Sequence, residues 1–147
     1  MTGPIFLIGY RGAGKSIRQM FADEGEAAFR DLETRVLADL AQRSASVIAT
    51  GGGVVLRPEN RAQLKSGFVV WLTAPASVLW RRLQSDSTTN ERRPNLAQGG
   101  LAEIEALLAV REPIYRACAD AVVDAVSDRP DDIAIRISAI HKERSSR

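Results

Sequence analysis

The chain has 147 residues, of which 45% are apolar and 26% are charged. These proportions are ordinary for a globular protein, and the length predicts one domain, residues 1–147, with one sizeable core. The net charge of +2, without a basic stripe or an aromatic platform, argues against nucleic-acid binding. The single cysteine, Cys118, excludes an intramolecular disulfide framework and favours a reducing, cytoplasmic location. No apolar run approaches the roughly 18 residues of a membrane span, and no signal peptide is expected.

Short apolar runs alternate with segments of helical periodicity. Buried strands are predicted at "PIFLIG" (4–9), "VIAT" (47–50), "FVVWL" (68–72) and "AVVDA" (121–125). Helices are predicted over about 17–42, 57–67, 74–86, 101–120 and 131–140, the first bent at Gly25 and the fourth broken at Pro113. The polar stretch 87–100 is predicted to be a mobile lid loop and 141–147 a frayed tail. This alternation predicts a three-layer α/β fold with a central parallel sheet covered on both faces.

The stretch "GYRGAGKS" (9–16), the candidate phosphate cradle, follows the first predicted strand and fits the pattern G-x-x-x-x-G-K-[ST]. Its backbone at Gly12, Ala13 and Gly14 is expected to wrap around phosphate oxygens at the start of a helix. Lys15 would reach the β- and γ-phosphates of ATP, and the Ser16 hydroxyl would bind Mg²⁺. A glycine-rich turn with a chance Lys-Ser pair is the simpler interpretation, which the preceding strand disfavours. The motif predicts a nucleoside triphosphate site and leaves the acceptor open.

Five further stretches make the pattern more specific. They are "EGEAAFRDLE", "VIATGGGVV", "VVWL", "RRPNL" and "REPIYRACAD". With the cradle, they occur in the order found in shikimate kinases, and the chain resembles that family from residue 1 to about residue 124. The resemblance implies a P-loop fold of the nucleoside-monophosphate-kinase type. It also implies a monomer that transfers the γ-phosphoryl group of ATP to the 3-hydroxyl of shikimate.

The resemblance implies roles for four residues outside the cradle. Arg30 and Arg111 would bind the carboxylate of shikimate, for which the planar guanidinium fork is well suited. Gly52, the middle residue of "GGG", would contact shikimate through its backbone. Arg93 would belong to a lid that closes over ATP and stabilises charge during transfer.

Simpler interpretations of these residues remain open at the level of sequence. Each substrate arginine could pair with a glutamate of its own helix, such as Glu33 for Arg30 or Glu112 for Arg111. The glycine run could be a flexible turn, and the lid arginine an exposed residue without a role. The family resemblance favours the ligand-binding interpretation in each case.

The chain departs from the family directly after the cradle. The family carries the rest of a helix, a strand and an Asp-x-Asp motif there, whereas here Ser16 is followed at once by "IRQMFADEGEAAFR". In the family those carboxylates serve Mg²⁺ and the hydroxyl that is phosphorylated. Because a parallel strand needs a crossover of about a dozen residues or more, four strands are expected where the family has five. The junction Ser16–Ile17 reflects a genuine deletion, a gene-model error or residues lost from the recorded sequence. A distance far above about 3.8 Å between the Cα atoms of Ser16 and Ile17 would indicate that residues are missing between them.

The missing carboxylates leave two main functional hypotheses. In the first, the chain is a shikimate kinase that uses ATP and Mg²⁺. In the second, it is a non-catalytic ATP- or shikimate-binding remnant of that family. A kinase for another small acceptor, such as gluconate, agrees less well with the glycine run and the two spaced arginines. The nearest carboxylates in sequence are Asp23, Glu24, Glu26 and Asp31, and none of them is assigned the missing role.

Overall fold

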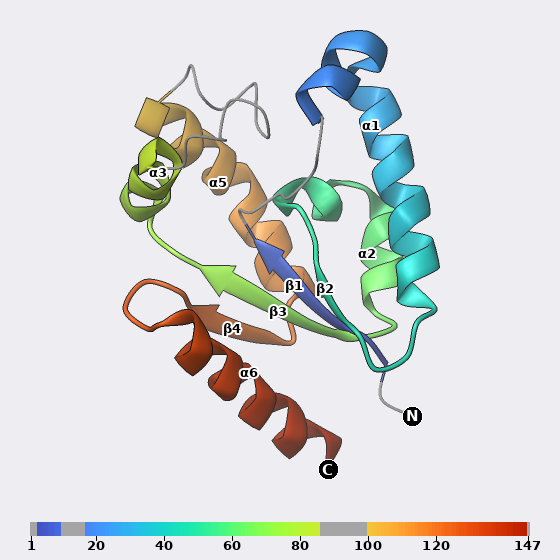
Figure 1. Ribbon diagram of the computed structural model, residues 1–147, viewed down its shortest axis with the longest axis vertical. Coiled ribbons are helices and arrows are strands. Elements are labelled where there is room, and N and C mark those ends of the chain that lie inside the picture. The colour runs from blue at the N-terminus through green and yellow to red at the C-terminus, as the bar shows by residue number, and fades with distance from the viewer. Residues whose placement is uncertain (1–2, 10–16, 86–99, 147) are drawn as a thin grey trace.

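The computed structural model describes residues 3–9, 17–85 and 100–146 of the chain (Figure 1). The strands in this part are β1 (Ile5–Gly9), β2 (Val47–Ala49), β3 (Phe68–Thr73) and β4 (Ala121–Asp124). The helical elements are α1 (Ile17–Ala41), the 3-10 helix η1 (Gly52–Leu56), α2 (Pro58–Leu64), α3 (Ala76–Ser85), α5 (Gly100–Cys118) and α6 (Pro130–Ser145). Strands and helices alternate as the sequence predicted.

The described strands form one parallel sheet in the order β2-β1-β3-β4. In this register Leu7 of β1 pairs with Ala49 of β2 on one side and with Val70 of β3 on the other. The prediction of four parallel strands is therefore confirmed. Because parallel strands end at the same edge of a sheet, the segments that follow β1 and β2 begin side by side.

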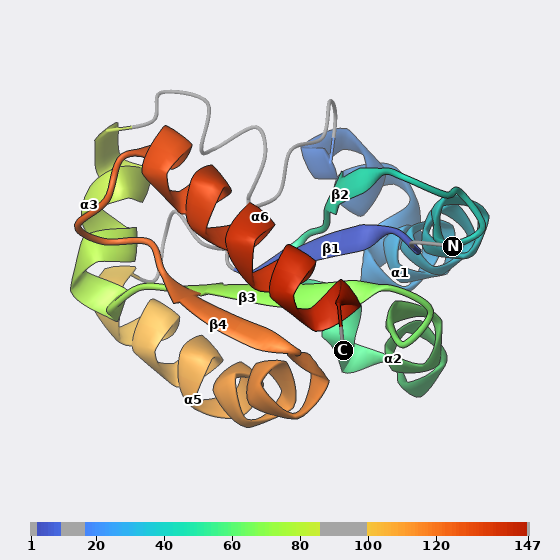
Figure 2. The ribbon, with the colours of Figure 1, turned by 90° about the horizontal axis from the view of Figure 1, so that it is seen from below.

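One face of the sheet packs against α1, η1, α2 and α5 (Figure 2). Its core includes Phe6 of β1, Val69 of β3 and Tyr115 of α5, each at most 1% exposed. Alternate residues of a strand point to opposite faces, so Val69 lies in this core whereas Phe68 and Val70 lie in the other. This larger core holds α5 and η1 together beneath the central strands.

The opposite face is covered by α6 among the described helices, with Ile137 packed against Val70 and Val123. At the β2 edge this face is open, since Val47 is 66% exposed whereas its neighbour Ile48 is buried. The predicted cover of this face is thus present over β3 and β4, and no described helix lies over β2. The open edge agrees with a chain that lacks a helix and a strand after the cradle.

The two predicted helix interruptions had different outcomes. The bend at Gly25 is confirmed, because this residue has φ 81° and ψ 173° inside α1, a backbone conformation that glycine readily adopts. The break at Pro113 is wrong, because α5 runs through it without interruption. Pro113 is exposed, whereas Ile104 and Tyr115 anchor the helix in the core on either side of it. This packing outweighs the one backbone hydrogen bond that proline removes.

The end of the last helix also differs from the prediction. The segment 141–147 was expected to fray, but α6 continues to Ser145. His141 packs its ring 5.2 Å from that of Phe68, and Arg144 forms an ion pair with Asp120 at 2.8 Å. These contacts extend the helix over the amino edge of the sheet. In the described part of the chain, no helix is both long and apolar enough to span a membrane.

Candidate functional site

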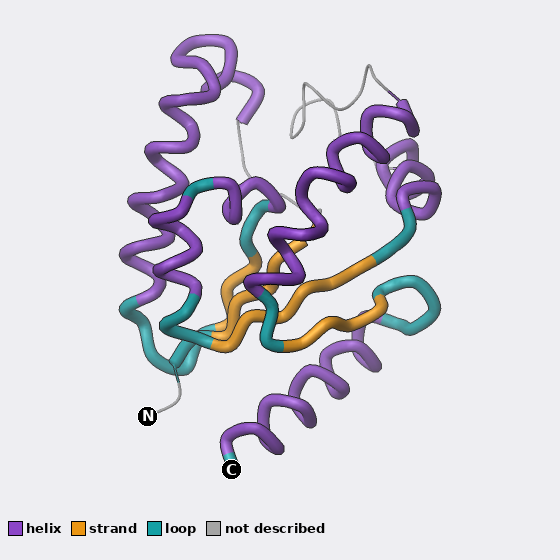
Figure 3. Tube along the Cα trace, turned by 180° about the vertical axis from the view of Figure 1, so that it is seen from behind, coloured by secondary structure: helices purple, strands orange, loops and turns teal. Residues whose placement is uncertain are grey.

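The predicted substrate residues lie around η1, which follows β2 at the carboxyl edge of the sheet. Gly51 leads into η1, and a hydrogen bond of 3.2 Å from the Val54 amide to the Gly51 carbonyl closes the first turn. Gly52 and Gly53 are buried. The glycine run is therefore a packed turn of 3-10 helix rather than the flexible turn that the sequence left open. Seen from behind, η1 lies between α1 and α5 (Figure 3).

Arg30 reaches η1 from α1. Its Nη1 donates to Glu33 Oε2 at 2.8 Å and its Nη2 lies 3.4 Å from Glu26 Oε1, so pairing with glutamates of its own helix does occur. The side chain is only 15% exposed, and its Nη2 and Cζ lie 2.6 and 2.7 Å from where a Cβ on residue 53 would stand. Gly53 thus leaves the space that the guanidinium fills. The buried Nε of Arg30 has no hydrogen-bond acceptor among the described residues.

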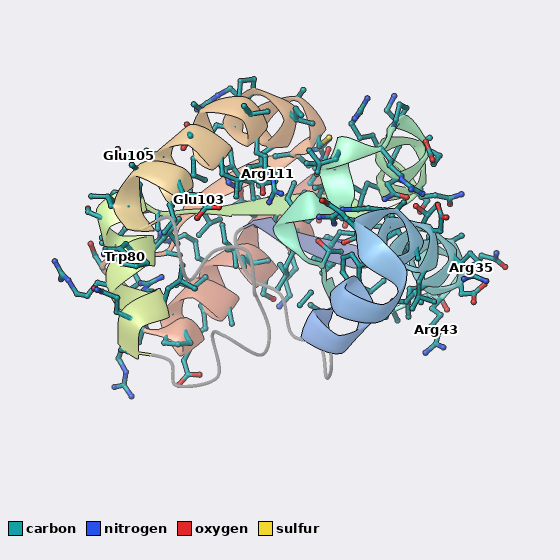
Figure 4. The ribbon with its side chains drawn as sticks, turned by 90° about the horizontal axis from the view of Figure 1, so that it is seen from above. Arg35, Arg43, Trp80, Glu103, Glu105 and Arg111 are labelled. Carbon is teal, nitrogen blue, oxygen red and sulfur yellow. The ribbon has the colours of Figure 1, made fainter. Side chains whose placement is uncertain are left out.

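Tyr115 connects α5 to η1. It is fully buried, and its hydroxyl donates to the Gly52 carbonyl at 2.8 Å. Burial raises the pKa of Tyr115, and the positive charge of Arg111, four residues earlier on the same face of α5, opposes that rise. Figure 4 shows Arg111 pointing from α5 toward the centre of the molecule, whereas Arg35 of α1 and Arg43 of the loop after it point outward. The Tyr115 hydroxyl therefore lies where the predicted substrate residues of three elements meet.

Sequence reasoning did not identify Tyr115 as a site residue. The stretch "REPIY" drew attention to Arg111, and a tyrosine on the apolar face of a helix is most simply interpreted as core. The spacing of four residues between Arg111 and Tyr115 was the one available indication, because it places both side chains on the same helix face. The bond to Gly52 joins residues 63 positions apart and has no counterpart in sequence spacing.

The burial of Tyr115 is expected to make stability depend on pH in the alkaline range. Burial raises the pKa of Tyr115 above its usual 10.0, although Arg111 and Arg30 oppose the shift. Because the phenol then ionises more readily in the unfolded chain, the free energy of unfolding should fall as the pH rises above about 10. Urea unfolding at about pH 8, 10 and 11 measures this fall, which Tyr115→Phe should reduce. Burial also raises the pKa of Cys118, but that contribution is common to both proteins, so equal slopes would contradict the prediction.

Six of the predicted site residues lie outside the described residues. They are Gly12, Ala13, Gly14, Lys15 and Ser16 of the cradle, and Arg93 of the lid. The junction after the cradle and nearly all of the stretch 87–100 fall there as well. The chain nevertheless leaves β1 at Gly9, at the same sheet edge where η1 follows β2. The predicted ATP cradle and η1, which carries Gly52, therefore follow neighbouring strands.

The described residues contain no group of three or more histidine, cysteine, aspartate or glutamate side chains that could hold a metal ion. Two of the carboxylates closest in sequence to the cradle are engaged in ion pairs. Glu26 pairs with Arg30, and Asp31 pairs with Arg57 at 2.7 Å. These two carboxylates are therefore held by arginines of the described part of the chain.

The family model for shikimate kinase matches residues 10–141. The chain belongs to the shikimate kinase family. It is 44% identical over 128 residues to a shikimate kinase of Microcystis aeruginosa, an alignment that covers 86% of this chain and 65% of the relative. It is 43% identical over 127 residues to a shikimate kinase of Rhodopirellula baltica, covering 85% and 68%. The chain thus spans about two thirds of the length of these curated shikimate kinases.

Solved shikimate kinase structures share the fold. One from Acinetobacter baumannii in complex with shikimate aligns with a TM-score of 0.87 and 29% identity, covering 97% of this chain and 94% of that one. One from Aquifex aeolicus aligns with a TM-score of 0.74 and 30% identity, covering 97% and 98%. The predicted family and the predicted P-loop kinase fold class are both confirmed.

Proposed function

We propose that this chain is a shikimate kinase, which transfers the γ-phosphoryl group of ATP to the 3-hydroxyl of shikimate on the route to chorismate and the aromatic amino acids. The observation that supports this most directly is the convergence of Arg30, Gly52 and Arg111 from three separate elements around one buried hydroxyl. Family membership supplies the reaction type. Because the chain spans only about two thirds of its relatives, the activity itself is inferred.

The described part of the site suits a small carboxylate. Two guanidinium groups, from Arg30 and Arg111, offer charge-assisted hydrogen bonds that a carboxylate accepts in a planar arrangement. The Nε–H of Arg30 is buried and has no acceptor among the described residues, and an unpaired buried donor is costly unless a ligand satisfies it. Gly52 and Gly53 add backbone groups that no side chain screens. A compact hydroxylated acid such as shikimate fits this set of groups.

The phosphate donor is assigned to the cradle that follows β1. Backbone groups of Gly12, Ala13 and Gly14 would surround the phosphates, and Lys15 would contact the β- and γ-phosphates. Ser16 would ligate Mg²⁺, which supplies charge neutralisation between the β- and γ-phosphates when bound. Phosphate oxygens and water would complete the coordination of the ion, an arrangement typical of Mg²⁺.

In the proposed reaction the 3-hydroxyl oxygen of shikimate attacks the γ-phosphorus. A new P–O bond forms as the bond to the β–γ bridging oxygen breaks, ADP leaves with that electron pair, and the hydroxyl proton is released to water. Such transfers pass through a loose transition state, so positioning and charge stabilisation dominate. Arg30 and Arg111 would position the acceptor, and Lys15 and Arg93 would stabilise charge on the transferred group. The missing Asp-x-Asp motif removes the group that would orient the hydroxyl, so the turnover rate should suffer most.

A coupled assay of ADP release, run with and without shikimate, tests this function. Shikimate-dependent release that Lys15→Ala abolishes is the expected result, because the mutation removes the cradle's charge on the β- and γ-phosphates. Binding of ATP and shikimate without release would instead identify a non-catalytic remnant. Release that depends on gluconate rather than shikimate would identify a different acceptor. No binding of shikimate would contradict the proposal outright.

The cellular setting is proposed along with the function. We infer a cytoplasmic protein in which residues 1–147 act as one domain and as a monomer, with ATP and shikimate as its small-molecule partners and no nucleic-acid partner. The single cysteine and the family support this inference. Light scattering during size-exclusion chromatography measures the mass directly, and a mass near 32 kDa, twice the 16.0 kDa of one chain, would contradict the monomer.

A further inference from the structure

The Tyr115 hydroxyl donates one hydrogen bond across the fold, to the backbone of η1. A neutral phenol has one O–H donor and two acceptor lone pairs. The donor is committed to the Gly52 carbonyl at 2.8 Å. Arginine carries donors only, so the Arg111 guanidinium, whose charge acts on this phenol, can only donate to the lone pairs that remain on the phenol oxygen. The one order of donation that the chemistry of these groups allows is therefore Arg111 to Tyr115 to Gly52.

The hydrogen bond from Tyr115 to Gly52 fixes the backbone of η1. The Gly52 carbonyl belongs to the peptide plane that also carries the Gly53 amide, and the described peptides are all trans. In a trans peptide the carbonyl and the following N–H point in opposite directions. Holding the Gly52 carbonyl toward Tyr115 thus sets the direction of the Gly53 amide, next to the Arg30 guanidinium. One hydroxyl therefore sets the direction of a backbone group that lies beside Arg30.

We propose that Tyr115 is a positioning residue for the acceptor substrate, which it serves by holding the Arg111 guanidinium and the Gly52–Gly53 peptide in one fixed arrangement. This inference rests on the proposed function, because it assigns those groups to a carboxylate-bearing acceptor. Hydrogen bonds in such a chain strengthen one another in a buried setting. Tyr115 would not touch the substrate and would act only through its two partners.

If Tyr115 only stabilised the fold, another loss of core packing would change ligand affinity as well. The Tyr115 ring packs 5.7 Å from the Trp71 ring in the core, and Tyr115→Phe keeps that packing while removing only the hydroxyl. A matched control is Val123→Ala, which removes buried apolar volume beneath α6 on the other face of the sheet. If general loosening of the fold explained a change in affinity, Val123→Ala would produce it too.

Calorimetric titration of the full chain with shikimate, and separately with a non-hydrolysable ATP analogue and Mg²⁺, tests the proposal. Tyr115→Phe should raise the Kd for shikimate about tenfold, the change that corresponds to one lost hydrogen bond. It should leave the Kd for the ATP analogue unchanged, as should Val123→Ala for both ligands. An unchanged Kd for shikimate in Tyr115→Phe, or equal losses for both ligands, would overturn the proposal.

A second measurement needs no ligand and no turnover. In NMR spectra of the free protein, Arg111→Lys should shift the Gly53 amide resonance, because it breaks the chain of hydrogen bonds from the opposite end while keeping the charge. Tyr115→Phe should shift the same amide and increase the mobility of the Arg111 Nε–H. If the unmodified chain binds no shikimate, the proposed function fails, and these resonances still decide whether Tyr115 positions its two partners. Unaltered resonances in both variants would overturn the inference.

Discussion

Arg30→Ala should weaken the binding of shikimate by about 10²- to 10³-fold while leaving the affinity for ATP unchanged. Truncating one partner of a largely desolvated, hydrogen-bonded charge pair costs about 2–5 kcal/mol, and every 1.4 kcal/mol is about a factor of ten. The Arg30 side chain meets this condition, since it is 15% exposed and lies against η1. Titration calorimetry with each ligand separately measures both affinities.

The same helix supplies the control for this prediction. Arg35→Ala removes an equal charge from α1, but this side chain is exposed and points away from the site (Figure 4). Arg30→Lys keeps the charge and loses the fork, so it should fall between the two alanine variants. Removing Arg30 also leaves Glu33 without its partner, so thermal unfolding must be recorded for each variant. Equal shikimate affinities for the Arg30 and Arg35 variants would contradict the assigned role.

Sequence patterns predicted the architecture because local and tertiary preferences agree over most of the chain. The apolar runs that became β1 and β3 are flanked by glycine or proline and pack on both faces. The hydrophobic pattern of the sequence and the burial in the fold therefore both identify these runs as strands. Pro113 is where they disagree. A local rule predicts a break there, and the packing of Ile104 and Tyr115 on either side keeps α5 continuous. Contacts between distant segments decide such positions, and a single sequence does not contain them.

The site was predictable only in part, for a related reason. Arg30, Gly52 and Arg111 came from the family resemblance, because spacing alone equally allowed ion pairs within each helix. The structure contains such a pair, Arg30 with Glu33, and also brings the arginine against η1. The two interpretations are therefore compatible, since the glutamate helps to hold the guanidinium in place. Tyr115 could not have been ranked in advance, because its importance depends on a hydrogen bond across the fold.

Gly53→Ala should weaken shikimate binding by about ten- to a hundredfold with little loss of stability. A Cβ at this position would overlap the Arg30 guanidinium, with Nη2 at 2.6 Å and Cζ at 2.7 Å. The overlapping atoms are the far end of a flexible side chain, so Arg30 rather than the backbone should move. Displacing the guanidinium without deleting it should cost less than the Arg30 truncation, about 1.4–2.7 kcal/mol on the same scale. Paired shikimate titrations and thermal unfolding curves measure the two effects.

Two other glycines show why the effect should be confined to the site. At Gly51 the nearest atom to an added Cβ is Glu33 Oε1 at 3.5 Å, an ordinary contact, so Gly51→Ala should have a much smaller effect on affinity. At Gly67 the added Cβ would collide with the Pro4 carbonyl and would stand 2.7 Å from the Phe6 ring. Those atoms are backbone and core, so Gly67→Ala should lower stability by about 1–3 kcal/mol. A Gly53→Ala protein that loses stability like Gly67→Ala, yet binds shikimate normally, would show that the space beside Arg30 serves the fold rather than the site.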